Sequence, residues 1–399
     1  MWDKIFDAAM RRFVQRGALE VTVADGPARR YGEPGAEPVH VHLADEALLR
    51  KVILTPDMGI GEGYTDGRVI FPQDDPRPLI RLALMNRAVE ATPFLMRLLD
   101  SIAAPIQRFI AGNPLIRSRQ NVAHHYDLDG RLYDLFLDED RQYSCAYFPD
   151  DELSLEEAQV AKKRHIIGKL CLEPGMRVLD IGCGWGGMAL TLAKDYGAQV
   201  VGVTLSEEQL KIGRQRVKDA GLEDKIDLRL MDYRDVTEQF DRIVSVGMFE
   251  HVGRRHYREY FDKVRDLLTE EGVALIHTIG STDAPRATST WTRKYIFPGG
   301  YIPSMSETMA QIEKAHLVTA DVEVWRTHYA KTLRHWHERF MSHVDEAEKL
   351  HDDRFVRMWR FYLASAEEGF RLGTLVNFQF QLARSNTAVP VTRDYLYRN

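Results

Sequence analysis

The sequence predicts an α/β fold in which a mostly parallel, doubly wound sheet follows a smaller N-terminal α/β domain. Short apolar stretches alternate with helical patterns through the second half of the chain, as the strands and helices of a parallel sheet do. The first of these stretches leads through a glycine-rich turn into a helix. A polar stretch with glycine and proline separates this part from residues 1–112, which carry their own helix and strand patterns.

The N-terminal part begins with an amphipathic helix over residues 2–16. Apolar side chains such as Ile5, Phe6 and Phe13 fall on one face, and basic side chains enrich the other. Two interpretations stay open: the apolar face packs on its own domain, or it lies in a membrane interface. The elements expected next are strands at 19–23 and 39–43, a helix at 44–52, short strand-like pieces within 57–71 and helical structure over 79–110.

The chain is predicted to divide into a domain at 1–112, a linker at 113–120 and a second domain at 121–399. In an open parallel sheet the ligand lies beyond the carboxyl ends of the strands, so we look for chemistry there. The second domain is expected to contain strands at 178–181, 199–204, 226–231, 240–247 and 272–279, with helices at 156–172, 207–220 and 256–268.

The glycine-rich turn between residues 177 and 188 indicates a nucleotide site. Gly182, Gly184 and Gly187 satisfy G-x-G-x-x-G, which alone is a weak signal for a dinucleotide. Asp180 and the glycines at 182, 184 and 186 satisfy D-x-G-x-G-x-G, which resembles the S-adenosylmethionine (SAM) motif of Rossmann-like methyltransferases. A carboxylate beside the turn suits a cationic ligand and would repel a pyrophosphate, so Asp180 favours SAM.

Polar side chains also follow the second and third strands of the predicted sheet. Thr204 ends the second strand, and either Glu207 or Gln209, about one helical turn further on, would reach a ribose hydroxyl. Ser206 is expected to cap the helix that starts there, which is compatible with binding. Asp232 and Tyr233 follow the third strand, where a carboxylate and a ring suit contact with an adenine.

The fourth and fifth strands end in groups that suit catalysis. Glu250 follows the fourth strand, although a charge at a helix N-terminus also explains its position. His277 ends the fifth strand, and both a structural and a catalytic role are open for it.

Composition excludes several other classes of protein. The net charge of −6 argues against a nucleic-acid binder. Cys145, Cys171 and Cys183 are too few and too scattered for a disulfide framework or a zinc site, so we expect no metal and a reducing compartment. No apolar run approaches the length of a membrane span.

Aromatic residues gather in the stretch from 288 to 336. Such a cluster is a protein core by default. Here we expect an apolar cover over the active edge of the sheet, whose ring faces attract a cation. The residues are Trp291, Tyr295, Phe297, Tyr301, Trp325, Tyr329 and Trp336.

Several stretches between residue 121 and the C-terminus together resemble the cyclopropane-fatty-acyl-phospholipid synthase family, which includes the mycolic-acid methyltransferases. The resemblance implies a Rossmann-like class I SAM-dependent methyltransferase domain with a mostly parallel sheet. The stretches are HHYD at 124–127, QYSCAY at 142–147, the glycine turn, VTLSEEQ at 203–209, SVGMFEHV at 245–252, HTIG at 277–280 and KYIFP at 294–298.

The resemblance implies a reaction and the residues that carry it. In this family a methyl group moves from SAM to the double bond of an unsaturated acyl chain, and a bound bicarbonate takes a proton as the ring closes. The implied bicarbonate ligands are Cys145, Glu250, His277, the backbone of Ile279, and Tyr329. The implied SAM contacts are Tyr143, Ser144, Asp180, Gly182, Gly184, Trp185, Gly186, Gly187, Thr204, Leu205, Gln209, Asp232 and Tyr233. Because Glu250 is acidic, we predict that it shares a proton with the anion.

The resemblance also implies partners and a location. The domain at 1–112 resembles the extra domain of the bacterial members that act on phospholipids, so we expect membrane phospholipids with unsaturated acyl chains as substrates. We expect a homodimer in the cytoplasm, bound peripherally at the inner face of the cytoplasmic membrane. The chain departs from the family at one place: Ser365 and Ala366 occupy a region where many members carry a cysteine, so we expect no covalent catalysis from there.

Three other functions are open to this sequence. A SAM-dependent lipid C-methyltransferase would stop before ring closure and leave a methyl branch or a methylated olefin, and the implied bicarbonate ligands favour ring closure over it. A lipid-binding protein with a vestigial nucleotide site is disfavoured by the intact glycine turn. A nicotinamide oxidoreductase is disfavoured by Asp180 and by the aromatic cover.

Overall fold

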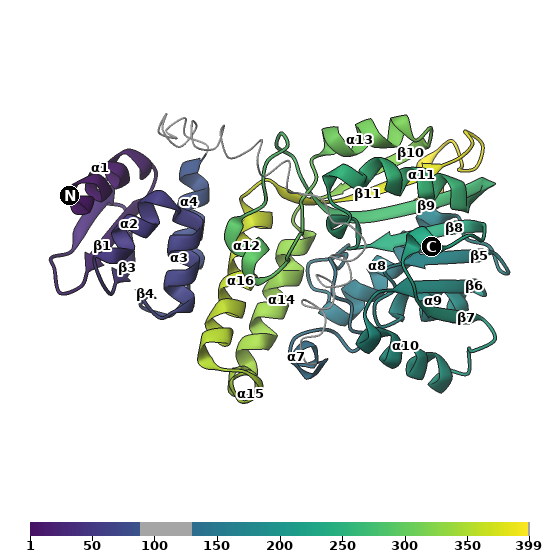
Figure 1. Cartoon of the computed structure of the whole chain (residues 1–399), viewed down its shortest axis with the longest axis horizontal. Coiled ribbons are helices and arrows are strands. Elements are labelled where there is room, and N and C mark those ends of the chain that lie inside the picture. The colour runs from purple at the N-terminus through teal and green to yellow at the C-terminus, as the bar shows by residue number, and fades with distance from the viewer. Residues whose placement is uncertain (88–129, 398–399) are drawn as a thin grey trace. The chain divides into compact units, whose positions relative to one another are not determined.

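We analysed a computed structural model of the chain, which describes residues 1–87 and 130–397 (Figure 1). The predicted linker at 113–120 and the motif at 124–127 lie outside the described residues. The chain forms two compact units that are interleaved along the sequence. Unit 1 comprises Met1–Phe109, Thr288–Phe297 and Leu333–Thr374, and unit 2 comprises Ile110–Ala287, Pro298–Thr332 and Leu375–Asn399. Two later segments thus belong to unit 1, and the predicted boundaries at 112 and 121 stay a prediction.

Unit 2 is built on a seven-stranded sheet in the order β10-β11-β9-β8-β5-β6-β7. The five strands from β9 to β7 in this order pair in parallel, while β11 runs antiparallel to both β9 and β10. The predicted α/β fold with a mostly parallel sheet is therefore confirmed. The bounds are β5 Arg177–Ile181, β6 Gln199–Thr204, β7 Ile226–Leu230, β8 Phe240–Val246, β9 Leu268–Ser281, β10 Val318–Trp325 and β11 Leu375–Ala383.

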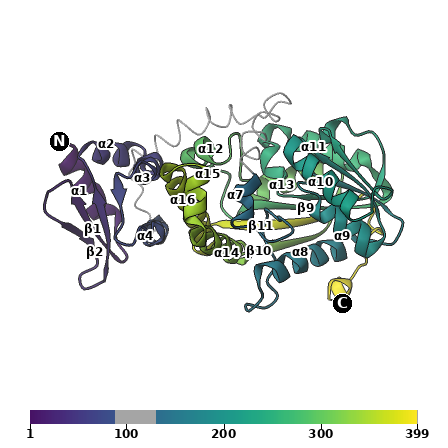
Figure 2. The same ribbon diagram turned by 90° about the horizontal axis from the view of Figure 1, so that it is seen from below.

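Helices cover both faces of this sheet, so its strands are buried on each side. Val178 of β5 joins the core formed with α8, α9 and α10, whereas Leu179 joins the core formed with α11 and α13. Figure 2 shows α11 and α13 on one side of the strands and α8 and α9 on the other. The bounds are α7 Gly130–Asp134, α8 Leu155–Leu170, α9 Gly187–Tyr196, α10 Glu207–Asp219, α11 Tyr257–Leu267 and α13 Met305–Lys314, with short 3-10 turns η1 Tyr233–Asp235, η2 Phe249–His251, η3 Arg254–His256 and η4 Arg393–Leu396.

Local sequence explains where the helices beside the pocket begin. Ser154 starts α8 because its side chain accepts a hydrogen bond from the backbone N–H of Glu157. The carboxylate of Glu157 in turn accepts a hydrogen bond from the backbone N–H of Ser154. Ser206 starts α10 by accepting the backbone N–H of Gln209, as predicted. α9 follows directly from the glycine turn, since Gly186 precedes it in a left-handed conformation.

Unit 1 contains a four-stranded sheet in the order β2-β1-β3-β4 and a set of helices. The prediction of strand-like pieces within 57–71 is wrong for most of that stretch, because it forms helix α3. Its glycines allow close packing: a Cβ on Gly61 would stand 2.4 Å from Trp291, and one on Gly59 would stand 2.7 Å from the backbone of Val52. The bounds are α1 Trp2–Phe13, β1 Ala18–Val23, β2 Arg29–Gly32, β3 Pro38–Leu43, α2 Ala47–Leu54, α3 Pro56–Thr65, β4 Val69–Ile70, α4 Arg77–Arg87, α12 Thr290–Tyr295, α14 His328–Ser342, which begins in unit 2, α15 Val344–Leu350 and α16 Asp353–Arg371.

The N-terminal helix contributes to the core of its own unit. Phe6 of α1 is buried and meets the ring of Tyr31 edge-on, with centroids 6.4 Å apart, while Ile5 remains exposed. Across residues 1–87 and 130–397, every helix falls short of the length or apolar character that a bilayer crossing demands.

Candidate active site

A cavity opens at the carboxyl ends of β5, β6, β7 and β8 in unit 2, where the sequence predicts the ligand. It contains about 1220 Å³ of empty space, part of it open to solvent. One wall comes from the segment at 141–144, which precedes α8. Of the residues predicted to contact SAM, all but Gly186 line this cavity: Tyr143, Ser144, Asp180, Gly182, Gly184, Trp185, Gly187, Thr204, Leu205, Gln209, Asp232 and Tyr233.

The glycine turn brings the backbone close to its neighbours at two points. Gly182 has a φ of +82°, and a Cβ there would stand 3.0 Å from the side chain of Met248. A Cβ on Gly187 would stand 2.3 Å from Gln142 and 2.6 Å from Asp140. Asp140 is itself held by Lys163 at 2.6 Å and by Arg216. The turn therefore needs glycine both for its conformation and to accommodate the 140–142 segment.

Asp180 provides the acidic group of the cavity. Its side chain is 2% exposed, and Oδ2 has no hydrogen-bond partner among the described residues. Burial raises the pKa of Asp180 to about 7, and the charge of Lys162 acts in the opposite direction. A buried carboxylate oxygen without a partner is costly, and an ammonium group of a ligand would satisfy it. The cavity thus fits SAM, whose amino acid portion carries such a group.

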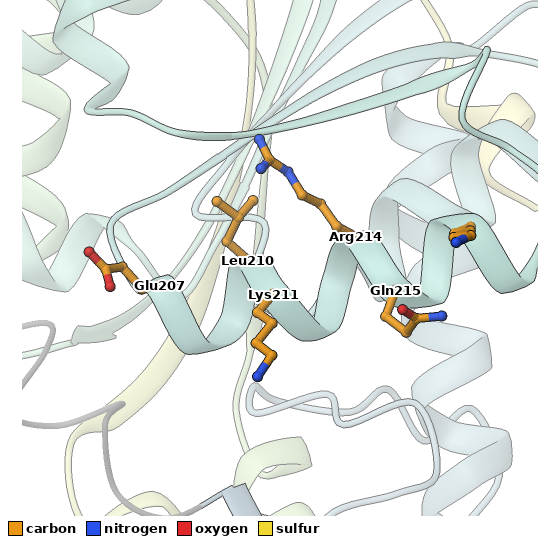
Figure 3. A pocket seen from close by; sticks show the side chains of 6 residues that line it. Glu207, Leu210, Lys211, Arg214 and Gln215 are labelled. Carbon is orange, nitrogen blue, oxygen red and sulfur yellow. The ribbon is translucent and has the colours of Figure 1, made fainter.

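The two candidates for the ribose contact separate clearly in the structure. Gln209 lines the cavity, where its Oε1 accepts a hydrogen bond from the hydroxyl of Thr204 at 3.1 Å. Glu207 lies instead at a separate pocket on α10, with Leu210, Lys211, Arg214 and Gln215 (Figure 3). Of the two, the geometry favours Gln209.

The residues after β7 are fixed by an ion pair. Both carboxylate oxygens of Asp232 receive bonds from the guanidinium of Arg234, at 2.9 and 2.8 Å, and the side chain also caps the turn η1. The Tyr233 ring packs edge-on against Tyr260, with centroids 5.4 Å apart. Asp232 and Tyr233 therefore stand rigidly at the cavity wall.

A second buried group lies at the ends of β8 and β9. Glu250 in η2 accepts the backbone N–H of Ile279 through Oε1, at 2.6 Å. Its other oxygen, Oε2, is buried and has no partner among the described residues. Burial raises the pKa of Glu250 to about 7, while the bond from Ile279 lowers it. Glu250 therefore exchanges a proton near neutral pH, which suits acid–base chemistry.

His277 on β9 is held between side-chain amides from β11. Asn377 Nδ2 lies 3.2 Å from Nε2 of the ring, and Gln379 Nε2 lies 3.0 Å from Nδ1. Trp325 meets the ring edge-on, with centroids 5.0 Å apart. Burial lowers the pKa of His277 to about 3, so the ring is neutral. Both ring nitrogens thus already face an amide, so a bicarbonate would have to displace one of them to bind His277.

Cys145 and Tyr329 come from two segments that are bonded together. The backbone N–H of Ala146 donates to Thr332 in the first turns of α14, at 3.0 Å, one turn from Tyr329. Cys145 is 1% exposed, and burial raises the pKa of its thiol far above the usual range, so it stays protonated. The bond from Ala146 to Thr332 thus connects the segment of Cys145 to α14, the helix that carries Tyr329. Glu250 and Ile279 are joined by a direct hydrogen bond.

The predicted aromatic cover is divided between the two units. Trp325 belongs to unit 2 and stacks on Tyr147 with centroids 4.8 Å apart, and Tyr301 donates its backbone N–H to the carbonyl of Glu250. Trp291 belongs to unit 1 and packs edge-on against Phe361, with centroids 4.8 Å apart. Tyr295, Phe297 and Trp336 also belong to unit 1.

Comparison with known proteins decides the family. The family described as mycolic acid cyclopropane synthetase matches residues 114–380. The chain belongs to this family. It is an enzyme of the SAM-dependent methyltransferase class, and SAM is its methyl donor.

Individual relatives extend the likeness beyond the catalytic part. The chain is 38% identical over 356 residues to the cyclopropane-fatty-acyl-phospholipid synthase of Escherichia coli, covering 88% of this chain and 89% of that one. It is 36% identical over 396 residues to a tuberculostearic acid methyltransferase of Mycobacterium tuberculosis, covering 95% and 91%. A solved structure of a mycolic acid cyclopropane synthase complexed with S-adenosylhomocysteine (SAH) shares 34% identity and a TM-score of 0.63, over 66% of this chain and 97% of that one.

Several residues of this enzyme's site were missed by sequence reasoning. His251 lines the cavity beside Met248, and burial lowers its pKa to about 4. Asn377 and Gln379 lie on a strand that the sequence analysis did not predict. Lys162 is fully buried on α8, and a signal for it was available: it falls four residues after Ala158 and four before Ile166, on the apolar face of a predicted helix.

A glycine substitution tests the donor cavity. We expect Gly182→Ala to weaken SAH binding by about tenfold or more, because the new Cβ meets Met248 and the left-handed conformation strains an L residue by roughly 1–2 kcal/mol. Titration calorimetry with SAH measures the change. Gly221→Ala is the matched control, since Gly221 also has a positive φ of +63°, but a Cβ there would have no neighbouring atom of the described residues within 4 Å. Equal SAH affinity in both variants would contradict the assigned cavity.

Proposed function

We propose that this enzyme is a cyclopropane-fatty-acyl-phospholipid synthase, which adds a methylene from SAM across the cis double bond of an unsaturated phospholipid acyl chain. The observation that carries the proposal is the pair of sites on neighbouring strand ends: a donor cavity with Asp180, and the buried Glu250 that accepts the N–H of Ile279 near the end of β9. The E. coli relative named for this activity covers most of residues 1–399, which supports a phospholipid substrate.

An alkene is a weak nucleophile, so the residues must align it with the donor and exclude water. The cavity residues Asp180 and Gln209 orient the donor. The π electrons of the alkene form a bond to the methyl carbon as its bond to the SAM sulfur breaks, which releases SAH and leaves a cation on the other alkene carbon. Loss of a proton from the new methyl group then supplies the electron pair that closes the ring.

We further propose that bicarbonate is the base, held at Glu250. The unpartnered Oε2 of Glu250 fits the hydroxyl of bicarbonate, which is the observation that supports the group. The remaining proposed ligands are Cys145, Tyr329, Ile279 and His277. Bound there, bicarbonate would supply a basic oxygen close to the cation. Glu250, with its pKa near 7, then shares the proton of that hydroxyl, which keeps the two acidic groups from repelling each other.

A second function, C-methylation without ring closure, has one observation in its favour. The relative named as a tuberculostearic acid methyltransferase covers 95% of this chain, so the likeness over the whole length does not choose between the two products. The two reactions share the donor and the first bond formed, and they differ in where the proton is lost.

The substrate leads us to propose where the enzyme acts. An acyl chain of a phospholipid is reached at a membrane surface, so we propose peripheral contact with the inner face of the cytoplasmic membrane. The domain at 1–112 is the proposed lipid-associated part, and the proposed assembly is a homodimer.

Product analysis tests the proposed function. We expect incubation with SAM and vesicles of cis-unsaturated phospholipid to give acyl chains that are one methylene heavier and resist ozonolysis, because ring closure consumes the double bond. Mass spectrometry of the chains before and after ozone treatment measures both properties. Chains that gain a carbon but are still cleaved by ozone would select the second function.

A further inference from the structure

One charged group beside the donor cavity takes no part in the reaction described above. Lys162 on α8 is fully buried, and its Nζ donates to Gln142 Oε1 at 2.7 Å and to Ser144 Oγ at 2.8 Å. Both acceptors are neutral. Among residues 1–87 and 130–397, no carboxylate is in hydrogen-bond contact with this ammonium. Such burial is costly, so a purely structural role explains the arrangement poorly.

The bonds from α8 fix one wall of the cavity. Gln142 and Ser144 both line the cavity, and Lys162 ties their side chains together. Gln159, one turn earlier on α8, donates to the backbone carbonyls of the same two residues, at 3.2 and 3.0 Å. The 142–144 wall is thereby attached to α8 through both its side chains and its backbone.

The charge of Lys162 also acts on the floor of the cavity. Asp180 lies at the end of β5 with an unpartnered, buried Oδ2, and Lys162 is the charged side chain that favours its ionised form. Burial lowers the pKa of Lys162 to about 8, so the group is charged at neutral pH. Its other ionisable neighbours are Asp138, Asp140, Lys163, Cys145 and His277, and Cys183 also faces Asp180.

We propose that Lys162 is a positioning residue for the methyl donor: its buried ammonium holds the 142–144 wall and favours the Asp180 carboxylate that receives the ammonium group of SAM. The wild-type enzyme then binds the donor with a pH dependence whose acid limb reports the protonation of Asp180. Removing the positive charge favours protonated Asp180, so the acid limb moves to higher pH. The proposal rests on the donor site alone and not on the proposed acyl substrate.

The test is calorimetric titration of the full chain with SAH across pH, with no lipid present. We expect Lys162→Met to move the acid limb upward by about one pH unit, which is a loss of affinity of about fivefold at neutral pH. Lys169→Met is the matched control, because Lys169 is equally buried on the same helix but bonds to Glu323. Its acid limb should coincide with that of the wild type.

A second comparison tests whether the effect of Lys162 acts through Asp180. In an Asp180→Asn background the acid limb is lost, and adding Lys162→Met should produce no further pH shift. An acid limb in Lys162→Met that matches the wild type would overturn the proposal. If both Lys162→Met and Lys162→Gln fail to fold, Lys162 is a structural residue and the proposal is likewise overturned. A lack of product on vesicles, in contrast, would count against the proposed function only, because SAH binding does not depend on lipid.

Discussion

Glu250→Gln is expected to lower turnover by about a thousandfold while donor affinity stays within about twofold of the wild type. A positioned acid–base group contributes roughly 10²–10⁴-fold, and a thousandfold corresponds to about 4 kcal/mol of barrier. Glutamine keeps the acceptor for the Ile279 N–H but can neither hold nor release a proton. Single-turnover measurement of product gives the rate, and titration with SAH gives the affinity.

The same variant also tests the proposed base. In buffer depleted of carbon dioxide, wild-type turnover should fall and recover on addition of bicarbonate, whereas Glu250→Gln should not respond. Glu307→Gln is the matched control, since Glu307 is a buried carboxylate of unit 2 that bonds to Tyr301 and Ser304. Comparable losses in the two variants would show that removing any buried carboxylate lowers turnover, and would remove Glu250 from the chemistry.

The pH dependence of turnover at limiting SAM follows from the protonation of Asp180. The pKa of Glu250 is raised to about 7 by burial, and that of Asp180 is raised to about 7 by the same cause. Both groups are protonated below that value, where Asp180 no longer attracts the donor. Turnover at limiting SAM should therefore fall as the pH drops through about 7, and saturating SAM should restore it.

Asp180→Asn is expected to weaken donor binding by about thirtyfold to a hundredfold slightly above neutral pH. The wild-type carboxylate presents an unpartnered, buried oxygen to the cavity, and a hydrogen bond to a charged group contributes roughly 1.5–3 kcal/mol. The amide retains the shape but offers no charge to the ammonium of SAM. Calorimetric titration with SAM measures the loss.

Glu207→Gln provides the control for a carboxylate near the donor motif. Glu207 is only a few residues from Gln209 in sequence, yet it lies at the separate pocket on α10. Its substitution should leave donor affinity unchanged. A loss of affinity as large as that of Asp180→Asn would place the ribose contact at Glu207 and contradict the geometry of the cavity.

Much of this fold follows from local sequence. Strands β5, β6, β8 and β9 contribute apolar residues to the cores on both faces of the sheet, and β5, β6 and β8 are each followed by a helix, which the hydrophobic pattern records directly. β10 and β11 were not predicted, because they pair antiparallel and do not follow the strand–helix alternation of the parallel strands. Helices α14, α15 and α16 separate β11 from β10 in the sequence. The helix at 56–65 was missed because its glycines serve packing, which a local pattern does not reveal.

Some residues of the candidate site are likewise predicted by local sequence, whereas others depend on contacts between distant parts of the chain. The donor residues follow strand ends in sequence, so a strand–turn–helix pattern suffices to place Asp180, whereas the choice of Gln209 over Glu207 needed the structure. The surroundings of His277 depend on β11, and those of Cys145 depend on α14, so long-range pairing decides them. The burial of Lys162 has a signal in the sequence, since it lies on the apolar face of α8, but its role is apparent only once the structure shows which acceptors its ammonium reaches.

The central claim is that the donor binds at the carboxyl ends of β5 to β8, in contact with Asp180 and the glycine turn. A crystal structure of the full chain grown with SAH tests it most directly. The account predicts SAH in this cavity, with its amino group at Asp180 Oδ2 and its ribose at Gln209. Density for SAH at another site, or a cavity that stays empty at saturating SAH, would contradict it.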